Sequence, residues 1–492
     1  MTRLAACWIL VLALAGALRF HDLGQRPLHA DEATGARITG RALEGQGYRF
    51  DPTHYHGPVL HRLGQLASLA AGHRRWADME ITPLRAVTAG AGLLTVALPL
   101  FGVRRYGQPA MLFAALLLAT SPMLVYYSRM FIHETLLALF GLLVFAQLSL
   151  RRHLWLIGLW AGLMWATKET FVISLAAWAA AAFACWLLLG KNRPHPRELL
   201  RRHGRDAALG LAVFLLVSIG FYTDGFRHGR GAWDAVHTYF VYHPTEGHEK
   251  PFAWYLQLLG LSETRGGLWW WTGAPLLLAI LTAVRSLSPR SPNPATVRFL
   301  AIATLLHLLA YSVISYKTPW LMVLPLAHIL LLAGLSVAFF PKRPALRVAA
   351  GLGLAGVIAW QLVQTVRSSF QFPTEARNRF AYVPTSPDIA GLTPWLEQLD
   401  AAQPDLPLQP ILVVGSDYWP LPWYLRRYEQ VGFYPEPPAE IDRMPLVFAT
   451  GDLTEQLIAT HVPVPRGLRD GLPITVWVRS DFWDASVQKS HD

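Results

Sequence analysis

Long apolar runs separated by short polar gaps fill the first three quarters of the chain. Most of these runs are long enough to cross the roughly 30 Å hydrocarbon core of a bilayer as a helix. Backbone groups at that depth must be hydrogen-bonded within the protein, which favours helices for runs of this length. The sequence predicts about eleven spans, at residues 4–18, 84–103, 110–127, 133–150, 154–167, 170–190, 207–222, 268–284, 297–315, 319–340 and 345–363.

The first run has two interpretations. It follows Arg3, and Ala15-Gly16-Ala17 resembles the small-residue cleavage site of a secretory signal peptide. The alternative is an uncleaved first span, which agrees better with the family resemblance described below.

Basic residues in the short gaps indicate the orientation. If the N-terminus is cytoplasmic, each basic cluster in a short loop falls on the cytoplasmic side, as the positive-inside rule expects. These residues are Arg104, Arg105, Arg151, Arg152, Lys191, Arg193, Arg197, Arg201, Arg202, Arg205, Arg285, Arg290, Arg298, Lys342, Arg343 and Arg347. We therefore expect a multi-pass protein of the plasma (inner) membrane with its C-terminal tail outside.

The tail, residues 364–492, changes to the pattern of a soluble α/β domain. Short apolar runs at 411–414, 446–449 and 474–478 predict strands, and 423–428 predicts a short helix. The predicted domains are thus a membrane module, 1–363, and an extracytoplasmic domain, 364–492. The membrane module has two long outer loops, at 21–83 and 223–267.

Composition supports a membrane protein and argues against a nucleic-acid partner. The chain is 53% hydrophobic and only 15% charged, whereas soluble proteins carry about 25% charged residues. The net charge is +11, but residues 367–492 carry 10 Lys and Arg against 16 Asp and Glu, so the excess lies in the loops between spans. Cys7 and Cys185 both lie in apolar runs, so neither a disulfide framework nor a cysteine metal site is available.

The first outer loop carries the strongest chemical signal. Asp31 and Glu32 follow the first span, where carboxylates can accept a proton from an acceptor hydroxyl or hold a divalent cation. The structural alternative is an ordinary helix start with Asp31 as N-cap. Further along the loop, His54 and His56 are candidate metal ligands or hydrogen-bond donors to a phosphate. Packing at the membrane interface is the alternative.

Two further polar groups lie at predicted outer ends of spans. Arg129 can donate to phosphate oxygens, and Glu134 follows five residues later, although the two can also pair with each other. Lys168 comes at the end of the fifth span, where its side chain can also extend toward the membrane surface without a functional role.

The remaining candidates flank the later spans. Arg265 lies in the second outer loop, and Tyr316 and Lys317 lie between the ninth and tenth spans. An ammonium group suits a lipid phosphate as a point charge. Extension toward the membrane surface is again the alternative for Lys317.

The placement of these groups is more informative than any one of them. Carboxylates and basic side chains recur at outer span ends, whereas a transport pathway or proton relay would place ionisable groups at mid-membrane depth. The pattern favours an enzyme with its site at the outer membrane surface.

The order and spacing of these motifs resemble a known family, the protein mannosyltransferase and aminoarabinose transferase superfamily of C-type glycosyltransferases (GT-C). The resemblance covers residues 1–340. It is closest to the flippase-activity-associated subgroup of archaea and bacteria. The motifs that carry it are His29-Ala30-Asp31-Glu32-Ala33, His56-Gly57-Pro58, Ser121-Pro122 with Arg129 and Glu134, and Tyr316-Lys317-Thr318-Pro319-Trp320.

The resemblance implies transfer of a hexose or pentose from a polyprenyl-phosphate donor to a hydroxyl of a glycan, lipid or protein acceptor, with inversion. It implies that Asp31 is the base and that Glu32 positions the acceptor or tunes Asp31. Lys317 and Arg129 would hold the donor phosphate, with Lys168 or Arg265 assisting. No cofactor is required, a divalent cation at Asp31, Glu32, His54 or His56 remains open, and the partners are the donor, the acceptor and the bilayer.

Two other function classes remain open at this point. A flippase or transporter component of the lipid-linked sugar pathway would be expected to show repeated halves with broken helices, and we find no internal repeat. A non-catalytic scaffold would not need Asp31. In the tail, Gly415-Ser416-Asp417 follows a predicted strand and is best interpreted as a plain β-turn.

Overall fold

The computed structural model describes residues 3–150, 152–242, 247–288, 294–340 and 343–489. The basic residues Arg151, Arg290 and Lys342 of the predicted cytoplasmic clusters lie outside the described residues.

The chain forms two compact units. We call the first the bundle unit; it comprises Met1–His21, Tyr48–Leu63 and Arg85–Phe372. The second, the sheet unit, comprises Asp22–Gly47, Gly64–Leu84 and Pro373–Asp492. Most of the predicted outer loop 21–83 therefore groups with the C-terminal residues.

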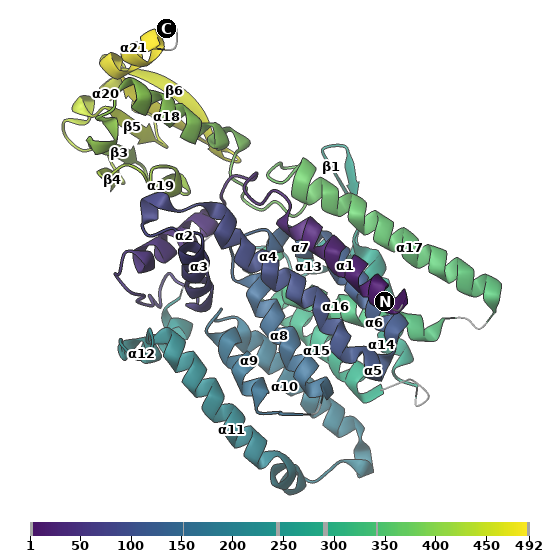
Figure 1. Cartoon of the computed structure of the whole chain (residues 1–492). Coiled ribbons are helices and arrows are strands. Elements are labelled where there is room, and N and C mark those ends of the chain that lie inside the picture. The colour runs from purple at the N-terminus through teal and green to yellow at the C-terminus, as the bar shows by residue number, and fades with distance from the viewer. Residues whose placement is uncertain (1–2, 151, 243–246, 289–293, 341–342, 490–492) are drawn as a thin grey trace. The chain divides into compact units, whose positions relative to one another are not determined.

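Helices make up the bundle unit (Figure 1). Its long or apolar helices are α1 (Arg3–Phe20), α4 (Ile81–Ala97), α6 (Gln108–Thr120), α7 (Pro122–Ser128), α8 (Glu134–Leu150), α9 (Leu156–Trp165), α10 (Phe171–Leu188), α11 (Pro196–Tyr222), α14 (Gly273–Arg285), α15 (Pro294–Val313), α16 (Val323–Leu335) and α17 (Pro344–Val366). Shorter elements are α3 (Val59–Ala70), which begins in this unit, α5 (Val103–Tyr106), α12 (Arg230–Val241), α13 (Trp254–Gly260), β1 (Glu263–Arg265) and β2 (Leu268–Trp270).

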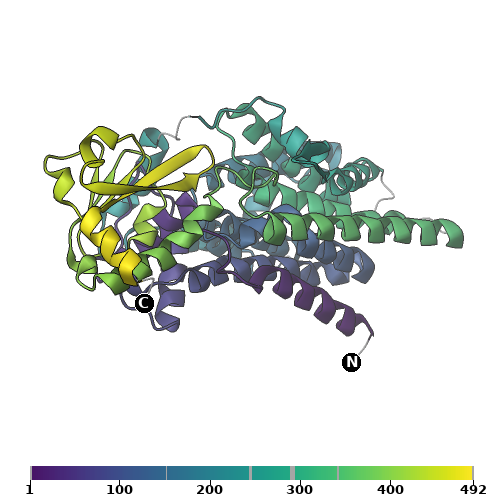
Figure 2. The same ribbon diagram turned by 90° about the horizontal axis from the view of Figure 1, so that it is seen from above.

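Helices that are far apart in the sequence pack together in the bundle unit. The helix pairs α8 and α9, α9 and α11, and α10 and α15 lie side by side, and α16 packs on α6, α8 and α14. In the view from above, helices of the bundle unit run alongside one another (Figure 2). The end of α9, the starts of α8 and α10 and the end of α15 lie at the same end of the bundle, because Lys168 pairs with Glu134 and the charges of both act on Tyr311.

The apolar helices lie at the positions of the predicted spans, but fewer of them than the eleven predicted reach spanning length among the described residues. Among the described residues, six helices are long and apolar enough to cross a membrane, or seven if the bent pair α6 and α7 forms one span. This pair bends by 58° at Ser121-Pro122, because proline cannot continue the hydrogen bonding of the preceding helix. The four shorter apolar helices, α1, α8, α9 and α14, coincide with the remaining predicted spans. The chain is a multi-pass membrane protein.

The sheet unit contains a five-stranded mixed sheet of order β4-β3-β5-β7-β6. Strands β4, β3 and β5 are parallel, and β7 and β6 are antiparallel to their neighbours. The strands are β3 (Ile411–Val414), β4 (Val431–Tyr434), β5 (Leu446–Ala449), β6 (His461–Arg469) and β7 (Leu472–Arg479). The helices of this unit are α2 (Ala30–Leu43), α18 (Leu392–Ala402), α19 (Leu421–Tyr424), α20 (Thr454–Leu457) and α21 (Ser480–Lys489).

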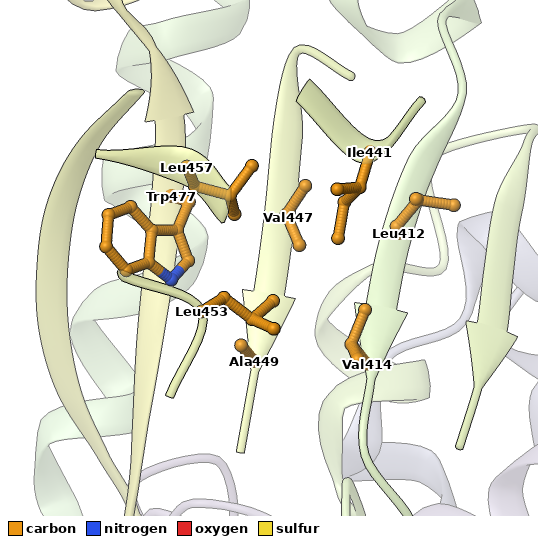
Figure 3. Close-up of a cluster of buried hydrophobic side chains, with 8 residues drawn as sticks. All are labelled: Leu412, Val414, Ile441, Val447, Ala449, Leu453, Leu457 and Trp477. Carbon is orange, nitrogen blue, oxygen red and sulfur yellow. The ribbon is translucent and has the colours of Figure 1, made fainter. Parts of the chain in front are cut away.

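Every residue of β3 and β5 is buried, so both faces of the sheet centre are covered. One face forms a hydrophobic cluster in which strand side chains meet residues after β4 and β5 (Figure 3). Its members are Leu412, Val414, Ile441, Val447, Ala449, Leu453, Leu457 and Trp477. The mixed sheet confirms the predicted α/β character of the tail.

Candidate active site

The carboxylates Asp31 and Glu32 lie in the first turn of α2, in the sheet unit. The sequence allowed Asp31 as N-cap, but that is wrong: His29 caps the helix, and its ring Nδ1 accepts from the Asp31 N–H at 3.2 Å. The Glu32 carboxylate accepts in return from the His29 N–H at 3.1 Å. The Glu32 carboxylate is thus occupied by the capping box. It is fully buried and lies 3.8 Å from Arg26. By contrast, 57% of the Asp31 side chain is exposed. Of the two carboxylates, Asp31 is therefore the one that is accessible from solvent.

A buried ionic cluster lies in the bundle unit. The Lys168 Nζ is 2.5 Å from Glu134 Oε1, and both side chains are almost fully buried. The His56 Nδ1 lies 2.9 Å from Glu169 Oε2. Lys168 and Glu169 are adjacent, so the two pairs form one cluster, which we call the ion-pair cluster.

Burial and charge act in opposite directions on this cluster. Burial lowers the pKa of Lys168, but the carboxylates of Glu134 and Glu169 outweigh it and hold the pKa above its usual value. Burial raises the pKa of Glu169, but the charge and hydrogen bond of His56, with the charge of Lys168, lower it to about 2. Both groups are therefore charged at neutral pH.

Two further histidines lie beside the ion-pair cluster. The ring centroid of His133 lies 5.0 Å from that of His56 and 5.3 Å from that of His61. The rings of these three histidines therefore lie together beside the ion-pair cluster.

Gly57 fixes the position of His56. A Cβ at this residue would lie 2.3 Å from the Ala166 carbonyl oxygen, and the Val59 N–H donates to the same oxygen at 3.0 Å. The His56-Gly57-Pro58 turn therefore packs directly on the segment that carries Lys168 and Glu169.

We expect Gly57→Ala to destabilise the protein by about 1–3 kcal/mol, because the added methyl group meets backbone that cannot move aside easily. The measurement is the thermal unfolding midpoint in lipid nanodiscs. Gly351→Ala is the matched control, since nothing lies within 4 Å of its added Cβ. Equal midpoints for the two variants would contradict the close packing.

Acid should weaken the His56–Glu169 pair. The folded-state pKa of Glu169 is depressed from 4.5 to about 2, so its stabilisation is present above about pH 4.5 and is lost as the pH falls toward 2. The shift corresponds to stabilisation on the order of 3 kcal/mol. Glu169→Gln should therefore flatten the fall of the unfolding midpoint between pH 6 and pH 3, while Glu198→Gln should not. A fall of equal size in wild type and Glu169→Gln would contradict this assignment.

The Arg129 side chain donates hydrogen bonds to backbone carbonyls. Its Nη1 donates to the carbonyls of Leu18 (3.3 Å), Arg19 (3.3 Å) and His21 (2.6 Å), and its guanidinium lies 4.5 Å from the Phe370 ring centroid. These contacts satisfy carbonyls left open at the end of α1. Glu134 pairs with Lys168 and not with Arg129, so the Arg129–Glu134 pair allowed by the sequence is wrong. Phosphate binding by Arg129 stays a prediction.

Lys317 is also buried, so extension to the membrane surface is wrong for this residue, as it is for Lys168. Its ammonium group donates to the carbonyls of Lys250 (3.2 Å) and Ile314. An ammonium group has three donors, so these two contacts within the described residues leave one for a ligand. Burial lowers the pKa of Lys317.

The other candidate residues each contact a partner outside the ion-pair cluster. Tyr316 forms an isolated antiparallel β-bridge with Glu249 through the backbone. Its ring centroid lies 5.3 Å from that of His248. Arg265 lies in β1 and pairs with Glu263. His54 is exposed and pairs with Asp51 at 3.2 Å. Among the described residues, no three His, Cys, Asp or Glu side chains lie close enough together to hold a metal ion, so the divalent cation stays a prediction.

Sequence reasoning missed part of this site. Arg62 pairs with Asp224, which also accepts from the Tyr48 N–H at 3.4 Å. Asp224 directly follows the apolar run of α11. An acidic residue at the end of a predicted span was the signal available for it.

Solved structures identify the fold. No protein-family profile matches the sequence, and no curated protein matches it. The structure matches ArnT from Cupriavidus metallidurans in the apo state with a TM-score of 0.68, at 16% identity, over 97% of this chain and 99% of that chain. The chain has the GT-C fold.

Two further structures extend this GT-C similarity. ArnT from Cupriavidus metallidurans bound to undecaprenyl phosphate matches with a TM-score of 0.67, at 17% identity, over 96% of this chain and 98% of that chain. The oligosaccharyltransferase AglB from Archaeoglobus fulgidus, in complex with an inhibitory peptide and a dolichol-phosphate, matches with a TM-score of 0.51. Identity to AglB is 15%, over 91% of this chain and 69% of that chain.

Proposed function

We propose that the protein is a glycosyltransferase that moves a sugar from a polyprenyl-phosphate donor to an acceptor hydroxyl on the outer face of the membrane. The observation that carries the proposal is the GT-C fold over almost the whole chain, shared with an ArnT structure that holds undecaprenyl phosphate. Support comes from the charged groups at one end of the bundle unit and from exposed Asp31 in the sheet unit. On the motif resemblance, we further propose that the chain belongs to the flippase-activity-associated subgroup.

In the proposed reaction, Asp31 accepts the proton of the acceptor hydroxyl. The acceptor oxygen forms a bond to the anomeric carbon, and the bond from that carbon to the phosphate oxygen breaks. Polyprenyl phosphate leaves with the bonding electron pair, and the anomeric configuration inverts. In this proposal Glu32 does not contact the substrate. It holds the first turn of α2, which carries Asp31, through the capping box.

Positive groups of the bundle unit would hold the donor phosphate. Lys317 has a free donor within the described residues, and Arg129 and Lys168 carry buried charge at the same end of the helices. Arg265 is the more exposed candidate. The proposed orientation has the N-terminus in the cytoplasm and the sheet unit outside the plasma (inner) membrane.

Binding of the lipid product tests the phosphate site without any acceptor. We expect Lys317→Met to weaken binding of undecaprenyl phosphate about 10- to 100-fold, because a hydrogen bond to a charged group contributes about 1.5–3 kcal/mol. Affinity would be measured by titration of the protein in detergent. Lys191→Met, an exposed lysine in the gap between α10 and α11, is the control. Equal affinities for wild type and Lys317→Met would remove Lys317 from the phosphate site.

A further inference from the structure

A cavity of about 320 Å³ lies within the sheet unit. Its volume is at the lower end of the range for small-molecule sites, about 300–1,000 Å³. It is lined by the stretch before α2, by the first residues of α4, which up to Leu84 belong to the sheet unit, by Ala390, and by α19 with the residues that follow. Its polar and aromatic lining comes from Gln25, Arg26, Glu80, Trp423, Tyr424 and Arg426.

Arg426 is held in a fixed geometry at this cavity. Its Nε donates to the Met79 carbonyl at 3.1 Å and its Nη1 to the Trp423 carbonyl at 2.8 Å. The guanidinium also lies 4.2 Å from the Trp423 ring centroid. These contacts leave the Nη2 group, with two N–H donors, available for a ligand within the described part of the chain. Burial lowers the pKa of Arg426 to about 10, so it remains charged at neutral pH.

The charges that line the cavity are balanced. Arg26 lies 3.8 Å from the Glu32 carboxylate, and the charge of Glu80 acts on Arg426. Each arginine thus has a carboxylate near it. An anionic ligand would therefore have to compete with that carboxylate for the arginine. Guanidinium donors and carboxylate acceptors side by side suit neighbouring hydroxyl groups, which both donate and accept.

The cavity is directly linked to the candidate catalytic carboxylates. Arg26 lines the cavity and also pairs with Glu32, which follows Asp31 in the same helical turn. We propose that this cavity binds a neutral sugar residue of the acceptor, so that the acceptor is a glycan or glycolipid and not an unmodified peptide. This inference rests on the proposed function, because it assigns the acceptor side of the same site.

Direct binding tests the inference without donor or turnover. The full chain in lipid nanodiscs would be titrated with a panel of neutral methyl hexosides and pentosides, and with glucuronate, by saturation-transfer NMR. We expect at least one neutral glycoside to bind saturably and more tightly than glucuronate. Arg426→Ala should weaken that binding at least tenfold. Ala390→Trp should do the same, because it fills the cavity from an exposed position without removing a contact.

Arg427→Ala is the matched control. Arg427 follows Arg426 in the sequence, but its side chain is exposed and pairs with Glu397. The inference is overturned if no neutral glycoside binds, if glucuronate binds better, or if Ala390→Trp binds as wild type does. Sugar binding without donor consumption would support the cavity and contradict the proposed function. Donor consumption that survives Ala390→Trp with an unchanged acceptor KM would contradict the cavity alone.

Discussion

Asp31→Asn should lower sugar transfer by about 10²–10⁴-fold, the usual contribution of a positioned general base. The amide keeps the size and the backbone hydrogen bond of the aspartate but cannot accept the acceptor proton. Because 57% of the Asp31 side chain is exposed, the unfolding midpoint should stay within a few degrees of wild type. The measurement is the rate of release of polyprenyl phosphate from labelled donor.

Asp484→Asn provides the control for this variant. Asp484 is an exposed aspartate on α21 of the same unit, so its neutralisation should leave turnover unchanged. Turnover of Asp31→Asn at the wild-type rate would exclude Asp31 as the base, whatever the donor proves to be.

Lys168→Met should destabilise the protein by about 3–5 kcal/mol, because it leaves the buried Glu134 carboxylate without its partner. Replacing both partners, as Glu134→Leu with Lys168→Met, should recover much of this loss, since no buried charge is then left unpaired. The measurement is the free energy of unfolding of the two single variants and the double variant.

The exposed pair of Glu198 and Arg202 on α11 is the control. Arg202→Gln should cost less than about 1 kcal/mol, as is usual for surface pairs. A double variant that is no more stable than Lys168→Met would contradict the account of the ion-pair cluster.

The helices were predictable because lipid imposes a simple rule on them: an apolar run of spanning length must pair its own backbone. Strands β3 and β5 were equally clear, since each is a short apolar run. Strand β6 was not predicted, because Pro463, Pro465 and Gly467 interrupt its pattern. It lies at the edge of the sheet, where proline is tolerated because one side of the strand needs no partner.

The pairings within the candidate site could not be predicted. His56 and Glu169 lie 113 residues apart, and nothing in either motif specifies the other. Their contact depends on Gly57 packing against the Ala166 carbonyl, which is a feature of tertiary structure. The sequence identified Lys168 and Glu134 as separate candidates, and only the packing of α8 on α9 makes them a pair.

Sugar transfer by the purified wild-type protein tests the central claim most directly. The protein in proteoliposomes would receive undecaprenyl-phosphate hexose or pentose, labelled in the sugar, with a cell-envelope extract as acceptor. We predict that label moves to the acceptor while undecaprenyl phosphate accumulates. Donor that stays intact, or that only changes leaflet, would contradict the claim.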